Sequence, residues 1–192
     1  MDRDLILVKH SLPQIDPDLV PSRWTLAEEG RRRAGILAAT LASYAARTIV
    51  SSPEPKALET ARIIATTDDL PVAVIDELHE HERDDEPFLP AREFEDRIAG
   101  FFAQPDRLVF GRETAPDALL RFTRAVSSIV ETHPDGSIAI VSHGTVITLF
   151  VAACTGVEPF RFWQRLGLPS FVVLALPELT LRHTQFEIEP VC

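Results

Sequence analysis

The chain has 192 residues, of which 45% are hydrophobic and 25% are charged, a composition typical of a folded globular protein rather than a disordered one. Its formal net charge is −10 and no basic face is visible, which argues against nucleic acid or an anionic membrane as a partner. The length predicts a single domain over residues 1–192. The longest apolar stretch, 138–157, is interrupted by His143. We therefore expect a buried strand and helix there, not a membrane span, and a cytoplasmic protein.

Short apolar runs, which predict strands, alternate along the chain with stretches in which apolar residues recur every three or four positions, as in helices. In chain order these patterns predict a strand at 5–9, a helix at 26–44, a strand at 48–50, a helix whose first turn contains Pro53, a strand at 72–75, a helix near 92–102, a long helix capped by Thr114, a strand at 138–141, a helix at 145–154, and strands at 171–176 and 181–188. This alternation predicts an α/β fold, a three-layer sandwich in which a mostly parallel central sheet carries helices on both faces.

An acidic segment, residues 77–86, follows the third predicted strand and contains six acidic side chains, two histidines and one arginine. Because so many charges are costly to bury, this segment is expected to be a loop or lid that stays out of the core. It is superficially similar to metal-binding loops of metallohydrolases, but Arg83 stands where an aspartate ligand is needed, so we expect no metal. Cys154 and Cys192 form neither a disulfide framework nor a zinc pattern, and Cys154 is expected to be a small core residue.

Ionisable side chains follow the carboxyl ends of four predicted strands. Lys9 and His10 follow the first strand, Lys56 the second, Glu80 the third and His143 the fourth. The carboxyl ends of parallel strands lie at one edge of a sheet, which is where ligands bind in such folds. Two imidazoles beside two ammonium groups form an anion site, and the anion that suits them best is phosphate.

The same residue types predict phosphoryl-transfer chemistry. A neutral histidine can attack phosphorus and carry the phosphoryl group covalently. A nearby carboxylic acid can protonate the leaving alcohol and then act as a base on water. Cations stabilise the oxygens of the transferring group, and helices that begin after Ser52 and after Gly144 would add backbone N–H groups.

The segments that carry these residues resemble the motifs of the histidine phosphatase superfamily, which has the phosphoglycerate-mutase-like fold. The similar pairs are LVKHS at 7–11 with the family's LVRHG, the segment from Trp24 to Ala34 with WxLTxxGxxQA, SSPEPKALETA at 51–61 with SSPLxRAxQTA, LHE at 78–80 with LxE, and VSHG at 141–144 with VSHG. The order and spacing of these segments agree over nearly the whole chain.

The resemblance implies three catalytic residues, namely the nucleophile His10, the general acid and base Glu80, and the second histidine, His143. It also implies four phosphate-binding residues, namely Lys9, Lys56, Ser11 and Gly144. The two lysines stand in the places of arginines, and Ser11 stands in the place of a glycine. Lysine keeps the positive charge but lacks the two-bond grip of arginine, which predicts weakened catalysis or an unusual substrate.

Glu82 and Asp84 are close enough to Glu80 in the sequence to be alternative proton donors. The acidic segment and a bound phosphate are both expected to raise the pKa of Glu80 above that of an ordinary glutamate. Three aromatic side chains are expected to pack in the protein rather than to stack on a ligand, those of Trp24, Phe160 and Trp163.

The function that the resemblance implies is a metal-independent phosphomonoesterase that needs no cofactor and hydrolyses a small phosphorylated substrate through a phosphohistidine. The two lysines favour an alternative from another class, a phosphate-binding or regulatory domain with slow or no turnover. A phosphomutase is the third possibility, although only a short stretch of chain separates Lys56 from His143, and mutases of this family usually carry inserted segments there.

Overall fold

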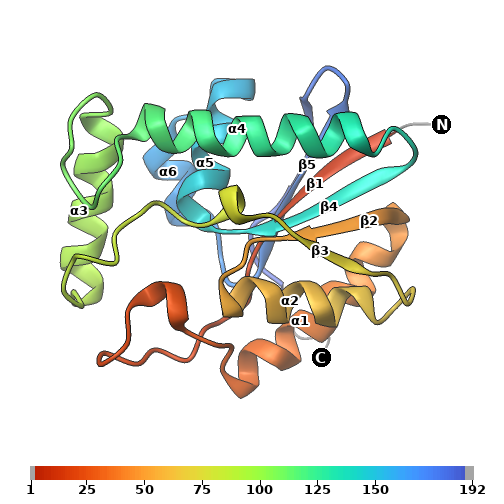
Figure 1. The fold of residues 1–192 in the computed structure, drawn as a ribbon, viewed down its shortest axis with the longest axis horizontal. Coiled ribbons are helices and arrows are strands. Elements are labelled where there is room, and N and C mark those ends of the chain that lie inside the picture. The colour runs from red at the N-terminus through yellow and green to blue at the C-terminus, as the bar shows by residue number, and fades with distance from the viewer. Residues whose placement is uncertain (1–2, 189–192) are drawn as a thin grey trace.

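The strands form one mixed sheet in the computed structural model, which describes residues 3–188 (Figure 1). The order across the sheet is β3-β2-β4-β1-β5-β6, where the strands are β1 (Arg3–Lys9), β2 (Ala46–Ser51), β3 (Val72–Val74), β4 (Ser137–Ser142), β5 (Ser170–Leu176) and β6 (Thr180–Gln185). β1 to β4 run parallel, whereas β5 is antiparallel to β1 and β6 is antiparallel to β5. The predicted α/β fold with a mostly parallel sheet is confirmed.

Helices cover both faces of this sheet, as predicted (Figure 1). The helices are α1 (Glu28–Leu41), α2 (Pro55–Ala65), α3 (Ala91–Ala103), α4 (Ala115–Thr132), α5 (Gly144–Thr155) and α6 (Pro159–Arg165), with short 3-10 turns at 21–23, 42–44 and 76–78. β1 illustrates the layering. Leu5 and Leu7 pack in the cluster formed with α4 and α5, whereas Ile6 and Val8 pack in the cluster formed with α1 and α2. Since successive side chains of a strand point to opposite faces, the unbroken apolar run of β1 marks a strand that is covered on both sides.

Two helix starts have clear capping chemistry. Thr114 and Asp117 form a reciprocal capping box at the start of α4, which confirms Thr114 as the cap. Helix α6 was not predicted from the sequence. Its signal is Glu158, whose carboxylate accepts hydrogen bonds from the backbone N–H groups of Phe160 (3.1 Å) and Arg161 (2.8 Å).

The start of α2 differs from the prediction. The helix begins at Pro55 rather than at Pro53, and Ser52 does not cap it. A residue that precedes proline is disfavoured in the helical conformation, and Glu54 is accordingly extended (φ −65°, ψ 133°). The two prolines therefore hold residues 52–54 out of the helix, and the Ser52 hydroxyl is left to bond with His143 (2.7 Å).

The acidic segment 77–86 is largely a loop, as predicted, but the expectation that it stays out of the core is wrong for His81. This side chain is 2% exposed, and its ring centroid lies 4.2 Å from that of Phe101. Burial lowers the pKa of His81, so the imidazole enters the core as a neutral ring. Arg121 of α4 fixes the loop by donating to backbone carbonyls, including that of His79 (3.0 Å).

Cys154 is exposed, which makes its predicted place in the core wrong. Burial along α5 stops at Val151, so the last turn of this apolar helix lies at the surface. Cys192 lies outside the described residues. Between residues 3 and 188, no helix is both long enough and apolar enough to cross a bilayer.

Candidate active site

His10 follows β1 at the centre of the sheet, where its backbone N–H donates to the carbonyl of Ser142 on β4 (3.0 Å). Its side-chain Nδ1 lies 2.8 Å from the carbonyl of Ser11. A carbonyl only accepts, so in the neutral ring Nδ1 carries the proton and Nε2 keeps its lone pair. Burial, followed by the charges of His143 and Lys56, holds the pKa of His10 well below its usual value. A neutral imidazole with a fixed tautomer is the form that attacks an electrophile.

His143 ends the connection between β4 and α5, and its ring centroid lies 5.2 Å from that of His10. It is fully buried, with 0% exposure. Nε2 lies 2.7 Å from Ser52 Oγ and 3.4 Å from Glu54 Oε1, whereas Nδ1 has no hydrogen-bond partner among residues 3–188. Burial, followed by the charge of Lys56, also holds the pKa of His143 well below its usual value. The structure therefore brings the two predicted histidines together as uncharged rings.

Lys9 is packed tightly beside the start of α5. Its Nζ donates to the carbonyl of Leu166 (2.6 Å), and a Cβ at position 144 would lie 3.4 Å from Nζ and 3.2 Å from Cε. The absence of a side chain at Gly144 thus leaves room for the ammonium group. Burial lowers the pKa of Lys9 to about 8, although Glu80 opposes this shift. Lys9 is therefore a desolvated cation that loses its charge in mildly alkaline solution.

Ser11 has both of its donors engaged within the protein. Its backbone N–H donates to Thr60 Oγ1 (3.0 Å), and its hydroxyl donates to the carbonyl of Gly30 (2.7 Å). These bonds tie the turn after β1 to α1 and α2. A phosphate would have to replace one of them to bind Ser11 directly.

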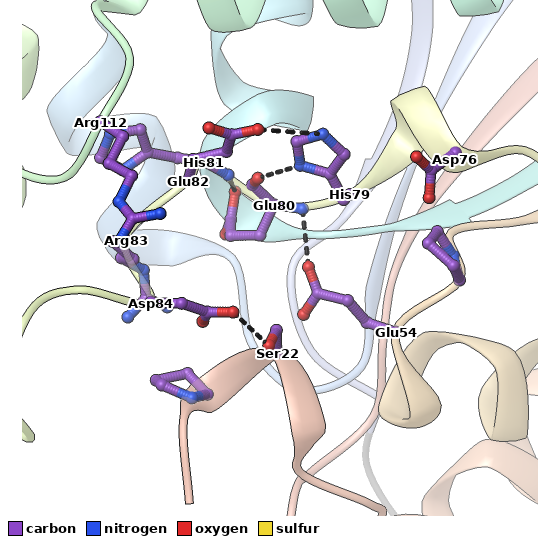
Figure 2. A pocket seen from close by; sticks show the side chains of 12 residues that line it. Ser22, Glu54, Asp76, His79, Glu80, His81, Glu82, Arg83, Asp84 and Arg112 are labelled. Atoms are coloured by element: carbon purple, nitrogen blue, oxygen red, sulfur yellow. Dashed lines mark hydrogen bonds and ion pairs between the residues drawn. The ribbon is translucent and has the colours of Figure 1, made fainter.

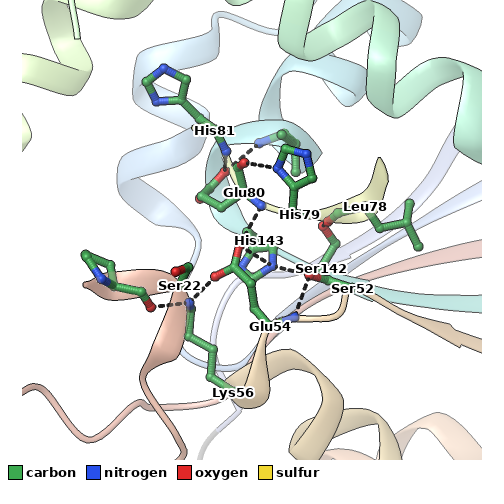
Figure 3. Close-up of polar contacts among 12 residues, drawn as sticks. Ser22, Ser52, Glu54, Lys56, Leu78, His79, Glu80, His81, Ser142 and His143 are labelled. Atoms are coloured by element: carbon green, nitrogen blue, oxygen red, sulfur yellow. Dashed lines mark hydrogen bonds and ion pairs between the residues drawn. The ribbon is translucent and has the colours of Figure 1, made fainter. Parts of the chain in front are cut away.

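Glu54 is a site residue that was not predicted from the sequence (Figure 3). It forms a buried ion pair with Lys56, whose Nζ also donates to the carbonyl of Pro21 (2.7 Å). Lys56 is 4% exposed and Glu54 is 8% exposed. The other carboxylate oxygen of Glu54 accepts from the backbone N–H of Glu80 (2.8 Å). The available signal was a charged residue at the position where the similar motif, SSPLxRAxQTA, has leucine.

The carboxylate of Glu80 binds the start of α5. It accepts hydrogen bonds from the backbone N–H groups of Thr145 (3.1 Å), Val146 (3.3 Å) and His81 (2.9 Å). Burial raises the pKa of Glu80, but attraction to the imidazole of His143 and to the guanidinium of Arg83, together with these hydrogen bonds, outweighs burial and leaves the pKa below its usual value. The expected upward shift is therefore wrong for the site as it stands. The helix terminus that was expected to meet phosphate already holds this carboxylate.

The two alternative proton donors lie elsewhere. Glu82 faces the ring of His79, with 3.8 Å between Oε1 and Nε2, and Asp84 accepts from the hydroxyl of Ser22 (2.5 Å). Both line a cavity of about 390 Å³ that is rich in acidic side chains (Figure 2). Within the described part of the chain, no group of three His, Cys, Asp or Glu side chains is placed to hold a metal ion. Of the three carboxylates, that of Glu80 is the one that lines the same cavity as His10.

A second cavity, of about 320 Å³, is lined by five of the seven predicted site residues, whereas Ser11 and His143 do not line it. Its ionisable lining residues are Lys9, His10, Lys56, Glu80, Arg83 and Glu86, and Gly144 also lines it. Its apolar lining includes five aromatic side chains, those of Trp24, Phe88, Phe94, Phe110 and Trp163. Trp24 and Trp163 thus form part of the cavity wall instead of packing only against the protein. Phe160 matches its expectation, since it stacks on Trp163 with 6.2 Å between ring centroids and does not line the cavity.

Residues 20–189 match the family described as "Histidine phosphatase superfamily (branch 1)". This range contains Lys56, Glu80 and His143, whereas His10 precedes it. A protein of Bacillus subtilis (strain 168) named "Uncharacterized phosphatase PhoE" is 27% identical over 111 residues, which cover 58% of this chain and 54% of that protein. The matching part of the chain thus spans about half the length of this curated relative.

Solved structures show the same fold. Bacillus stearothermophilus YhfR aligns with a TM-score of 0.76 and 23% identity, covering 98% of each chain. A mycobacterial glucosyl-3-phosphoglycerate phosphatase in complex with inorganic phosphate aligns with a TM-score of 0.72 and 22% identity, covering 97% of each chain. At these identities the likeness concerns the fold alone, but the family match extends over most of the sequence. The chain therefore belongs to branch 1 of the histidine phosphatase superfamily.

Proposed function

We propose that the protein is a metal-independent phosphomonoesterase that works through a phosphohistidine at His10. The observation that carries this proposal is the neutral His10 ring, whose Nδ1–H bond to the Ser11 carbonyl leaves Nε2 as the nucleophilic atom. Lys9, Lys56 and Glu80 line the same cavity. Family membership supports the reaction class, and a related structure binds inorganic phosphate.

In the first step, Nε2 of His10 forms a bond to phosphorus while the bond from phosphorus to the leaving oxygen breaks. Glu80 donates a proton to that oxygen, so that the leaving group departs as an alcohol. Lys9 and Lys56 stabilise the negative charge on the phosphoryl oxygens. The His10 ring becomes positively charged when Nε2 bonds to phosphorus. The carbonyl of Ser11 stabilises this charge by accepting the hydrogen bond from Nδ1–H, which gives Ser11 a positioning role.

Glu80 must hold a proton for this step, although its pKa is low before a substrate binds. A phosphate dianion repels the carboxylate and raises its pKa, so Glu80 takes up a proton as the substrate enters. In the second step the carboxylate of Glu80 accepts a proton from water, and the water oxygen bonds to phosphorus. The bond from phosphorus to Nε2 breaks, which releases inorganic phosphate and restores neutral His10.

One observation favours the alternative of a phosphate-binding domain with slow turnover. Lys56, which would otherwise grip phosphate, is already paired with Glu54. The two functions differ in their products, because a binding domain retains phosphate but neither releases alcohol nor forms a covalent intermediate.

The deciding experiment uses p-nitrophenyl phosphate and the His10→Ala variant. Wild-type protein should hydrolyse the ester in the presence of EDTA and should yield an acid-labile phosphoprotein when quenched, whereas His10→Ala should do neither. His183→Ala is a matched control, since His183 is an exposed residue on the edge strand β6. Undiminished turnover in His10→Ala would contradict the mechanism, and so would loss of activity on chelation that zinc or manganese restores.

A further inference from the structure

Arg83 is an arginine of the active-site cavity with no role in the chemistry proposed above. It lines the cavity together with His10 and Lys56, and its guanidinium carbon lies 4.6 Å from the centroid of the Phe94 ring. Its Nε is buried and has no hydrogen-bond partner anywhere in residues 3–188. A cation held against an aromatic face and left short of acceptors is prepared to receive an anion.

The absence of a partner is notable because Arg83 lies in the acidic segment. The acidic side chains at positions 82, 84, 85 and 86 each face or bond a group other than Arg83. Glu82 faces His79, Asp84 accepts from Ser22, Asp85 pairs with Arg112 (3.0 Å), and Glu86 accepts from the backbone N–H of Gly111 (3.1 Å). Figure 2 shows Arg83 and Glu54 on opposite sides of Glu80. The carboxylate of Glu54 pairs with Lys56 and not with Arg83. Among the described residues, Arg83 forms no ion pair.

Apart from Glu86, whose carboxylate accepts a hydrogen bond from the backbone N–H of Gly111, the remaining walls of the cavity are apolar and aromatic. Trp24 lies 6.3 Å from Phe88, and Phe94 lies 5.9 Å from Trp163, measured between ring centroids. A volume of about 320 Å³ falls at the lower end of the range for sites that bind small organic molecules. Such walls favour a flat apolar group over a heavily hydroxylated one, which would lose hydrogen bonds to water on entry.

We propose that the cavity selects phosphomonoesters whose leaving group is an aromatic or similarly flat apolar body with one further anionic group. Arg83 binds that anionic group. This inference rests on the phosphatase function proposed above. A carboxylate offers two oxygens in the spacing of the guanidinium N–H groups. The aromatic walls would hold the body of the leaving group between the phosphoryl site and Arg83.

The competing role for Arg83 is a direct grip on the phosphoryl group, in compensation for the two lysines. Its charge does act on the site, since it helps to lower the pKa values of Glu80 and His143. The two roles predict different substrate dependence. A phosphoryl ligand matters equally for every ester, whereas a ligand of the leaving group matters only for esters that carry the second anion.

The experiment compares kcat/KM for phenyl phosphate, for 3- and 4-carboxyphenyl phosphate, and for the carbamoylphenyl phosphates of matching size. The wild-type protein should prefer a carboxylated ester over its carbamoyl counterpart by on the order of tenfold. Arg83→Gln should abolish this preference, whereas any change that arises through the pKa values of Glu80 and His143 should be shared by phenyl phosphate and all the other esters. Arg83→Lys should retain part of the preference. Arg112→Gln is the control, because Arg112 is exposed and does not line this cavity.

Two results would overturn the inference, namely no preference for the carboxylate in wild-type protein, or an equal loss for all esters in Arg83→Gln together with weaker phosphate inhibition. Circular dichroism checks that the variants are folded. If none of the esters is hydrolysed, the phosphatase proposal fails while the inference remains testable. Calorimetry then decides whether carboxyphenyl phosphate binds more tightly than carbamoylphenyl phosphate and whether Arg83→Gln removes the difference.

Discussion

Glu54→Gln tests whether the buried carboxylate beside Lys56 holds the phosphate site in a weakened state. Glutamine keeps the shape of the side chain and removes its charge. The amide oxygen can still accept from Lys56 or from the backbone N–H of Glu80, and Lys56 keeps its bond to the carbonyl of Pro21. The substitution therefore changes the electrostatics of the pocket more than its packing.

The expected effects on stability and on phosphate affinity have opposite signs. Removing one partner of a buried ion pair costs about 3–5 kcal/mol when nothing replaces it. Because Lys56 keeps neutral acceptors, we expect the free energy of unfolding to fall by about 1–3 kcal/mol. A phosphate on the far side of Lys56 would lie roughly 5 Å from the Glu54 carboxylate, where two unit charges repel by about 3 kcal/mol at an effective dielectric constant of about 20. Even partial relief of this repulsion predicts phosphate binding that is at least about tenfold tighter.

The assay is the inhibition constant of inorganic phosphate at neutral pH, paired with urea unfolding of the same samples. Glu59→Gln is a matched control on α2. Glu59 pairs with the exposed Arg31 (2.7 Å), and glutamine keeps an oxygen for the backbone N–H of Leu26, so the substitution should change neither quantity much. Unchanged or weaker phosphate binding in folded Glu54→Gln would refute the reasoning. It would mean that Glu54 holds Lys56 and His143 in the geometry that phosphate needs.

Three further predictions follow from the site. Glu80→Gln should slow the hydrolysis of alkyl phosphates far more than that of p-nitrophenyl phosphate, whose leaving group needs little protonation; equal slowing of both would contradict the role of general acid. Lys9 is charged below its pKa of about 8 and neutral above it, so phosphate affinity should fall as the pH rises through 8, and Lys9→Met should lack this dependence in a pH series of inhibition constants. Arg121→Met removes donors to the carbonyls of Glu77 and His79 and should lower the free energy of unfolding by about 2–3 kcal/mol in urea titrations, with a loss of turnover. An unchanged pH profile in Lys9→Met, or full stability and activity in Arg121→Met, would count against these assignments.

The fold was predictable because its elements carry local signals. The continuous apolar run of β1, the capping pair of Thr114 and Asp117, and the spacing of apolar residues on α4 each report on structure within a few residues. The errors arose where a distant contact decided the outcome. His81 is buried because its ring packs against Phe101 of α3, and Cys154 is exposed because the buried part of α5 ends at Val151.

Within the site, the rule that residues after the carboxyl ends of parallel strands lie close together correctly grouped five residues, namely Lys9, His10, Lys56, Glu80 and His143. The pattern could not reveal what each group is bonded to. The pKa of Glu80 depends on the start of α5, which follows it by more than sixty residues in the chain. Charge counted along a sequence is therefore a poor guide to charge in a pocket, because hydrogen bonds across the fold decide which groups remain available.

The positions of β1 and β4 at the middle of the sheet also determine how long each part of the site persists. Each strand is paired on both sides, so its amide hydrogens should exchange with solvent mainly through unfolding of the whole protein. Glu80 instead follows the short edge strand β3 and a single 3-10 turn, so local opening there must break contacts such as the hydrogen bond from Ser142 to the carbonyl of Leu78, but none of the strand pairing of β1. In native-state hydrogen exchange, the backbone amides of β1 and β4, which precede His10 and His143, should therefore exchange as slowly as the whole protein unfolds. The amides near Glu80 should exchange faster, at a rate set by local opening.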